Sequence, residues 1–433
     1  MLITFSVENW RCFKDEVTLN MTAGRERQHL ERLPTVKPFG LKLLPISAIY
    51  GANASGKTKL IEALAFLQQF VIHGTQSTDQ RIPVQRFKLD SDYLSRPVKF
   101  SVDVLIDEKI YSYTTQILPD AIVEESLVIE TNSKSLTVFK RFRNGKIAFD
   151  EKFFPSDRLN LMNVISQAAR RNQLFLTTAI QLGAFELEPL YNWFKTKLII
   201  LTPTSDHSAL NRFADPSDEL NAQMIDLIRK FGTGIDHFIS QPINESNPLD
   251  AKSLQLNIYN LVKDRIPQNT PSMRIMDLFT TKSGDETTIK RLVAIHKNKK
   301  EDDILFSLLE ESDGTRRLLD LIPAFVELRM KQNFVYVIDE LDRSLHTQLL
   351  EWLIRYYLNS CGEGSRSQLI FTTHDVNLLT QNIFRRDELW GVQKNFAGES
   401  DLYSFREFKD IRQDKDIRKI YLNGLIGAVP DIG

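Results

Sequence analysis

The segment of the chain best suited to chemistry is an octapeptide with two glycines and a lysine. It reads Gly51-Ala52-Asn53-Ala54-Ser55-Gly56-Lys57-Thr58. This spacing matches G-x-x-x-x-G-K-[ST], in which backbone N–H groups and the following helix N-terminus surround phosphate groups. In such a loop Lys57 reaches the outer phosphates and the Thr58 hydroxyl holds Mg²⁺. The octapeptide therefore predicts a site for a nucleoside triphosphate with Mg²⁺.

Two neighbouring carboxylates, Asp339 and Glu340, follow the apolar run 334–338. A short, continuously apolar run predicts a strand buried on both faces of a largely parallel sheet, and ligands bind at the carboxyl ends of such strands. We expect Asp339 to bind Mg²⁺, directly or through water, and Glu340 to act as the general base that deprotonates an attacking water. Without the octapeptide, the same two acids could be plain loop residues at a strand end.

Two further segments could contact the phosphates. Ser312 and Gly314 precede a helical run at 316–329, where a hydroxyl, free N–H groups and the helix dipole form an anion site. Taken alone, this pattern is that of an ordinary helix cap. His374 follows an apolar strand that begins at Gln368, and a histidine there can donate a hydrogen bond to the outermost phosphate. A surface or core histidine is the alternative.

The elements that must position these residues can be predicted from periodicity. Residues 1–50 are mainly strands, and the apolar run 45–50 leads through the octapeptide into a helix at 57–69. Between about 84 and 150, alternating apolar and polar residues predict antiparallel β-hairpins. Residues 155–200 are mostly helical in pattern. Residues 202–290 are polar and broken by Pro, Asn, Ser and Gly, which predicts helices and loops.

Composition limits the classes of function that are open. The chain has 433 residues, 42% hydrophobic residues and a net charge of −1, so it is no uniformly basic nucleic-acid coat, although local basic patches remain possible. Cys12 and Cys361 lie too far apart to indicate a disulfide framework or a cysteine zinc site. A signal peptide and an apolar run of membrane-spanning length are both missing, so we expect a cytoplasmic protein with no membrane partner.

The order of these motifs resembles that of ATP-binding-cassette (ABC) ATPases. In this resemblance Ser312-Asp313-Gly314 is the signature loop, His374 is the switch histidine, and Leu341-Asp342-Arg343-Ser344-Leu345-His346 is the loop that follows the catalytic glutamate. The signature loop of one copy completes the ATP site of another in that family. The resemblance thus implies a homo-oligomer, at least a dimer, with ATP and Mg²⁺ as cofactors and with Lys57, Glu340 and His374 in catalysis.

Within this family the chain is most similar to SMC-like heads and OLD-type ATPases. It resembles a subgroup of AAA ATP-binding proteins, the RloA-like or abortive-infection proteins of anti-phage defence. The segments that carry the resemblance are 5–10, Asp339-Glu340 with Ser344-Leu345-His346, 402–405, 421–424 and 427–430. In the subgroup, the glycine that corresponds to Gly424 is usually followed by a basic and then an aromatic residue. Leu425 and Ile426 depart from this pattern, so no role is assigned to them.

The resemblance also implies a glutamine that links Mg²⁺ and the attacking water to movement of the lobe. Gln85 is the candidate, with a solvent-facing strand residue as the alternative. Arg11 could approach the nucleotide from the N-terminal hairpin, and a surface arginine is again the alternative.

The fold class expected is α/β, a P-loop NTPase of ABC-ATPase type with a mostly parallel core sheet, an antiparallel β lobe and a helical insertion. The expected domains are an N-terminal ATPase lobe at 1–150, a helical and loop insertion at 151–300, and a C-terminal ATPase lobe at 301–433.

Two functions remain open. In the first, the protein is an ATP-hydrolysing sensor or scaffold of a bacterial anti-phage system that controls a separate effector, such as a nuclease or toxin. The tail after His374 is too short for the nuclease domain of OLD-type proteins. In the second, it is an SMC-like DNA-binding clamp in repair or maintenance. Its basic clusters are Lys297 with Lys299-Lys300, 140–143, and Arg170-Arg171.

Overall fold

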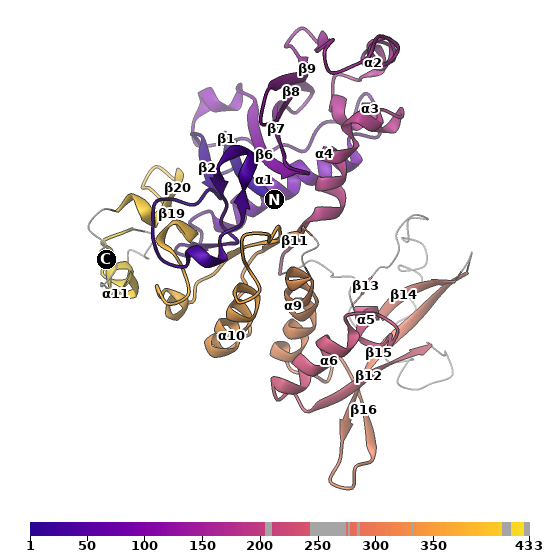
Figure 1. The fold of residues 1–433 in the computed structure, drawn as a ribbon, viewed down its shortest axis with the longest axis vertical. Coiled ribbons are helices and arrows are strands. Elements are labelled where there is room, and N and C mark those ends of the chain that lie inside the picture. The colour runs from indigo at the N-terminus through magenta and orange to yellow at the C-terminus, as the bar shows by residue number, and fades with distance from the viewer. Residues whose placement is uncertain are drawn as a thin grey trace. The chain divides into compact units, whose positions relative to one another are not determined.

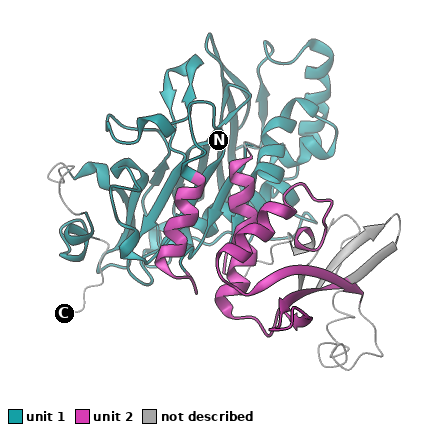
Figure 2. Cartoon of the chain, turned by 60° about the horizontal axis from the view of Figure 1, so that its bottom comes forward, with its two compact units in different colours: residues 1–201, 331–342, 358–433 teal, residues 202–330, 343–357 magenta. Residues whose placement is uncertain are grey.

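The computed structural model describes residues 1–203, 210–242, 274–275, 278–283, 286–330, 333–408 and 417–427. Two compact units are distinguished by colour in Figure 2. Unit 1 comprises Met1–Leu201, Lys331–Asp342 and Leu358–Gly433, and unit 2 comprises Thr202–Met330 and Arg343–Tyr357. The units interleave along the chain, because distant segments contribute strands to one sheet, whereas the three ranges expected from the sequence are consecutive.

The core of unit 1 is a six-stranded sheet with the order β11-β17-β18-β5-β19-β20. Its first five strands run parallel to their neighbours, and β20 is antiparallel at the edge. The strands are β11 (Leu198–Leu201), β17 (Val335–Ile338), β18 (Gln368–Thr372), β5 (Ile46–Tyr50), β19 (Leu389–Lys394) and β20 (Ser400–Ser404). Every residue of β5, β17 and β18 is buried, as continuous apolar runs predict. Because β5, β17 and β18 are parallel, the segments that follow them lie at one edge of the sheet.

A second sheet in unit 1 is antiparallel and has the order β10-β9-β8-β7-β6-β1-β2. Its strands are β1 (Leu2–Glu8), β2 (Val17–Asn20), β6 (Val98–Ile106), β7 (Lys109–Leu118), β8 (Ala121–Glu130), β9 (Ser135–Arg141) and β10 (Ile147–Phe149). Buried and partly exposed residues alternate along β8, which is typical of a sheet with one face on the core. The predicted N-terminal strands and the β-hairpins are confirmed.

Helices complete unit 1 and are labelled in Figure 1. They are α1 (Lys57–His73), α2 (Ser156–Ala168), α3 (Phe175–Gln181), α4 (Glu188–Asn192) and α11 (Ile417–Leu422). The predicted helix after the octapeptide is confirmed as α1, which ends at His73 before Gly74. A π-helical turn, Trp193–Lys197, connects α4 to β11. A small two-stranded sheet is formed by β3 (Thr35–Val36) and β4 (Leu41–Lys42).

Unit 2 contains helices and an antiparallel sheet with the order β12-β15-β14-β13, in which β16 also pairs with β15. The helices are α5 (Leu210–Phe213), α6 (Asn221–Lys230), α9 (Asp313–Arg329) and α10 (Thr347–Leu358). The strands are β12 (Ile235–Pro242), β13 (Arg274–Ile275), β14 (Leu278–Ser283), β15 (Glu286–Lys297) and β16 (Asp303–Ser307).

The expectation of helices and loops over 202–290 is wrong where the structure describes β12 to β15. These strands are rich in polar residues, so their alternation is weak, and β12 pairs with β15, a segment distant in sequence. The expected helices are present as α5 (Leu210–Phe213) and α6 (Asn221–Lys230), while 204–209, 243–273, 276–277, 284–285 and the predicted family segment 428–430 lie outside the described residues. Within the described residues, no helix is both long and apolar enough to cross a membrane.

Candidate functional site

The octapeptide forms the loop between β5 and α1, and its glycines are required by close approaches. A Cβ atom on Gly51 would lie 2.5 Å from the Val392 carbonyl oxygen, so a side chain there would force β5 away from β19. Gly56 has a φ of 124°, which strongly disfavours other residues. Gly56 is also the N-cap of α1 and offers no side-chain acceptor to the N–H groups of the first turn. This helix start is therefore suited to an anion.

Lys57 is buried, and its ammonium group lies in the loop. Its Nζ donates hydrogen bonds to the carbonyl oxygens of Gly51 at 2.8 Å and Ala52 at 3.0 Å. Burial lowers the pKa of Lys57 to about 8, while the negative charge of Asp339 is the largest influence that opposes this decrease. An ammonium group that is desolvated and held by neutral carbonyls is suited to an anionic ligand.

Asp339 and Glu340 follow β17 and are positioned by the neighbouring strand β18. The Thr372 hydroxyl donates a 2.6 Å hydrogen bond to Asp339 Oδ1, and the Glu340 N–H donates a 2.8 Å hydrogen bond to the same hydroxyl oxygen. The Asp339 N–H in turn donates to the Leu201 carbonyl at 2.8 Å, which connects it to β11. Glu340 has a φ of 50°, and such backbone strain clusters at functional sites.

His374 lies just beyond β18 and is held by the loop after Glu340. The backbone N–H of His374 donates a 3.2 Å hydrogen bond to Asp342 Oδ2. Burial lowers the pKa of the His374 imidazole, and the positive charge of Lys57 lowers it further. The imidazole is therefore neutral at pH 7, with one nitrogen able to donate and the other to accept.

A pocket of about 650 Å³ brings most of the predicted residues together. Its lining includes Asn53 to Thr58 of the octapeptide, together with Gln85, Glu340 and His374. Arg11 also lines it, with an ion pair to Glu62 at 3.0 Å. Asp339 is almost completely buried just below the surface of this site. The sequence therefore predicted residues that share one pocket, although they come from five separate segments.

Several residues in and around this pocket were given no individual role by the sequence. Thr372 and Asp342 are ordinary polar residues in the sequence, and their roles depend on the pairing of β17 with β18. Further cations line the same pocket: Lys59, Arg86, Lys88 and Lys394. Their excess of positive charge suits a polyphosphate. No local motif contains them, so only the folded chain identifies them.

Ser312 and Gly314 belong to unit 2 and do not line this pocket. Ser312 is the N-cap of α9, and its side chain accepts a 3.1 Å hydrogen bond from the Thr315 N–H. A Cβ atom on Gly314 would lie 3.0 Å from the Ser344 carbonyl oxygen, so glycine permits a close approach of the chain after Asp342. Within one copy of the chain, Ser312 thus has the role of a helix cap.

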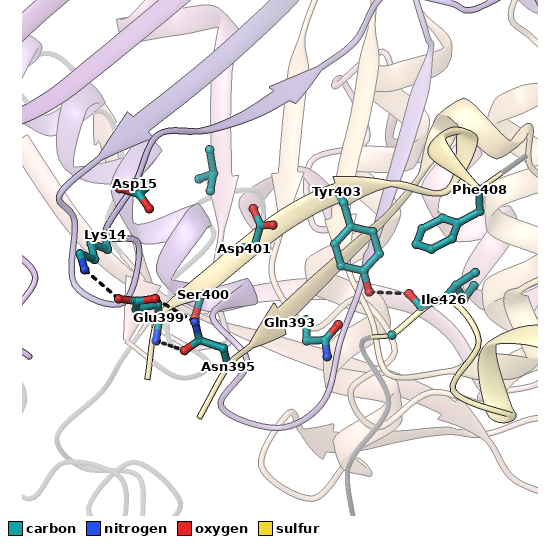
Figure 3. A pocket seen from close by; sticks show the side chains of 12 residues that line it. Lys14, Asp15, Gln393, Asn395, Glu399, Ser400, Asp401, Tyr403, Phe408 and Ile426 are labelled. Atoms are coloured by element: carbon teal, nitrogen blue, oxygen red, sulfur yellow. Dashed lines mark hydrogen bonds and ion pairs between the residues drawn. The ribbon is translucent and has the colours of Figure 1, made fainter. Parts of the chain in front are cut away.

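A neighbouring hollow of about 670 Å³ is less suited to phosphate (Figure 3). Lys14 is the one Lys or Arg among its described lining residues, and it is paired with Glu399 at 3.0 Å and Asp90 at 3.1 Å. This hollow nevertheless contacts the phosphate loop through Ser400, whose hydroxyl donates a 2.6 Å hydrogen bond to the Ser55 carbonyl. Ser400 therefore supports the loop at 51–58.

Comparison with known proteins gives one family and several distant structures. A family profile described as "AAA domain, putative AbiEii toxin, Type IV TA system" matches residues 46–380. No curated protein matches the chain.

Among solved structures, an SMC head bound to the C-terminal winged-helix domain of ScpA is 13% identical to this chain, with a TM-score of 0.41. The matched region covers 93% of this chain and 97% of the SMC-head chain. The SMC head domain of Thermotoga maritima is 11% identical, with a TM-score of 0.39, and the matched region covers 93% of this chain and 98% of that domain's chain. The likeness to both is distant.

Proposed function

The chain belongs to the AAA-domain family whose profile spans residues 46–380, and we propose that it binds and hydrolyses ATP with Mg²⁺. The observation that carries this proposal is the shared pocket around Lys57, Glu340 and His374. The phosphates would lie along residues 51–58, where backbone N–H groups, the start of α1 and the Lys57 ammonium favour negative charge. The octapeptide thereby supplies binding, and the residues after β17 and β18 supply chemistry.

Mg²⁺ would be held by Thr58 and Asp339. Hard cations take oxygen ligands, and the Thr58 hydroxyl and the Asp339 carboxylate are ligands of this kind. Asp339 influences Lys57 electrostatically, which agrees with a position beside the octapeptide. When bound, the ion would neutralise charge on the outer phosphates. Thr372 fixes one oxygen of Asp339 through its 2.6 Å hydrogen bond and so orients this carboxylate.

Glu340 is proposed to deprotonate the attacking water, and His374 to donate a hydrogen bond to the outermost phosphate. Both side chains line the pocket beside the octapeptide. The pKa of His374 is lowered, so a neutral imidazole performs this role at pH 7. Gln85 lines the same pocket and is proposed to respond to the nucleotide.

A second copy of the chain is proposed to complete the site. Ser312 and Gly314 stand at the N-terminus of α9, a helix of 17 residues whose dipole favours negative charge. In a homodimer of ABC type, this helix start from one copy would face the outermost phosphate bound by the other. ATP would then hold the two copies together, and hydrolysis would release them.

The proposed biological role is that of a sensor or scaffold in bacterial anti-phage defence. The family description refers to an abortive-infection toxin and a toxin–antitoxin system, which supports this role. The effector, a nuclease or toxin, is proposed to be a separate chain whose activity depends on the nucleotide state of this ATPase.

Replacing the proposed base tests the chemistry. Glu340→Gln keeps the size of the side chain, so ATP should still bind while hydrolysis falls by roughly 10²–10⁴-fold. The ATP-bound variant should also sediment as a dimer. Glu219→Gln, at an exposed position of unit 2, is the matched control and should hydrolyse ATP at the parent rate. Hydrolysis by Glu340→Gln at the parent rate would refute the assignment.

A further inference from the structure

A hollow of about 570 Å³ in unit 1 has an unusual concentration of arginines. Its lining consists of Gly24, Arg25, Glu26, Arg27, Arg386, Asp387, Arg406 and Glu407. None of these residues lines the nucleotide pocket, so the arginine hollow is a separate site. Arg25, Arg27 and Arg406 are exposed.

The backbone that carries Arg25 and Arg27 is held in place from one side. The Gly24 N–H donates a 2.6 Å hydrogen bond to Asp387 Oδ2, and the buried Arg385 guanidinium donates to the carbonyl oxygens of Glu26 and Gln28. Since residues 24, 26 and 28 bind the segment after β18, the intervening arginines are left on the exposed side. Their backbone is pre-organised, which lowers the entropy cost of binding a ligand.

The carboxylates of the hollow are already committed to other partners. Asp387 is bound by Arg385 at 2.7 Å, and Glu26 is bound by Arg386 at 2.7 Å. Glu407 accepts a 3.0 Å hydrogen bond from the Ser404 N–H. Among the residues that the structure describes, the guanidinium groups of Arg25, Arg27 and Arg406 have no hydrogen-bond or ion-pair partner. The guanidinium donors of these three arginines are thus free for a ligand, and Glu407 is the one carboxylate of the hollow with no ion pair among the described residues.

We propose that the arginine hollow binds the phosphodiester backbone of a nucleic acid. A guanidinium group presents a rigid fork of donors that matches phosphate geometry, and it remains charged at every physiological pH. A nucleic-acid strand presents one phosphate about every 3.4 Å along its axis, which suits several arginines in one hollow. An acidic peptide is less suited, because ordering each flexible carboxylate side chain adds an entropy cost.

Several cations of the basic clusters named from the sequence are already engaged by other groups. Lys297 is paired with Asp303, and Arg171 is paired with Asp120 at 2.6 Å. Arg170 donates to the backbone carbonyls of Thr75 and Gln76. The unpartnered arginines come from segments that are almost the whole chain apart, so no sequence cluster could reveal them.

The test compares two charge-matched triple variants. One variant is Arg25→Ala/Arg27→Ala/Arg406→Ala. The control, Arg81→Ala/Lys134→Ala/Arg143→Ala, removes three exposed cations elsewhere in unit 1. Binding of a fluorescein-labelled oligonucleotide, single-stranded or duplex, is measured by polarisation over a range of salt concentrations, with tripolyphosphate as competitor. ATP binding reports that each variant is folded and that the nucleotide pocket is intact.

The first variant should bind the oligonucleotide at least about tenfold more weakly than the parent. The slope of the logarithm of its binding constant against the logarithm of salt concentration should become less steep by about 2–3. The control should bind like the parent. The proposal would be overturned if both variants bound the oligonucleotide equally well or lost binding equally. It would also be overturned if the parent protein bound tripolyphosphate but no oligonucleotide. The proposal does not depend on ATP hydrolysis, so the Glu340→Gln result and this result can fail separately.

Discussion

The Thr372 hydroxyl donates a 2.6 Å hydrogen bond to Asp339 Oδ1, across the pairing of two parallel strands. The same oxygen accepts the Glu340 N–H at 2.8 Å. One side chain on β18 therefore positions both acids at the end of β17, and Thr372 is itself completely buried. This one hydroxyl group thus contacts both the proposed metal ligand and the proposed base.

Thr372→Val should therefore slow ATP hydrolysis more than it weakens ATP binding. Valine has nearly the same shape but cannot donate to Asp339 or accept from Glu340. The unpaired Glu340 N–H should cost about 1–3 kcal/mol of stability. We expect a fall in kcat and a higher Mg²⁺ concentration for half-maximal activity, measured by phosphate release.

Thr372→Ser is the matched control, because it retains the hydroxyl and loses only a methyl group. It should keep most of the parent activity and the parent Mg²⁺ dependence. If valine and serine had equal effects on the Mg²⁺ dependence, the hydroxyl group would have no positioning role.

The affinity for ATP should decrease as the pH rises above about 8, the pKa to which burial lowers Lys57. Only the protonated amine attracts phosphate, and ATP phosphates are already fully charged in this range. Affinity should be constant just below this pH and should fall by up to about tenfold for each unit above it. Titration calorimetry at several pH values measures this. Lys57→Ala should bind weakly with no such decline, and a pH-independent affinity in the parent would contradict the assignment.

Local sequence was sufficient to predict the conformation of the octapeptide and of the elements that flank it. Residues 46–73 form a strand, a glycine loop and a helix, because all the signals for that unit lie within one short segment. The strand that precedes Asp339 was equally clear from its continuous apolar run. The pocket around Glu340 could be inferred because parallel strands end at the same edge of a sheet.

Residues whose roles depend on long-range pairing could not be predicted in this way. Thr372 is one of two adjacent threonines, and only the register of β18 with β17 assigns it to Asp339. Ser400 supports the loop through the Ser55 carbonyl, from a strand near the other end of the chain. The arginine hollow likewise combines Arg25 with Arg406. No sequence pattern contains these pairs, because the fold alone brings them together.

Gly314→Val should destabilise unit 2. A Cβ atom at this position would already lie 3.0 Å from the Ser344 carbonyl oxygen, and the two further methyl groups of valine have to displace that backbone. We expect a loss of roughly 1–3 kcal/mol in urea unfolding. Gly364→Val is the control, because a Cβ atom there meets nothing within 4 Å. Equal unfolding midpoints for the two variants would show that the Ser344 backbone can move away from a side chain at position 314 without loss of stability.

Glu388 should make the protein less stable as the pH rises towards neutrality. Burial raises the pKa of this carboxyl from 4.5 to about 7, although the charge of Arg32 opposes the increase. The folded chain therefore holds a proton at Glu388 between these pH values, whereas the unfolded chain does not. Stability from this group is present at low pH and is lost as the pH rises through about 7.

Glu388→Gln imitates the protonated acid and should remove this pH dependence. Glu388 Oε2 accepts from the Arg32 guanidinium and from the Arg385 N–H at 2.8 Å, and a glutamine oxygen can keep both bonds. The parent should therefore lose on the order of 2 kcal/mol relative to the variant between pH 5 and 7. Thermal unfolding at several pH values measures the difference. Glu363→Gln, at an exposed ion pair with Lys37, should follow the parent. If the stability of Glu388→Gln changed with pH in the same way as that of the parent, the carboxyl would be ionised in the folded protein throughout this range.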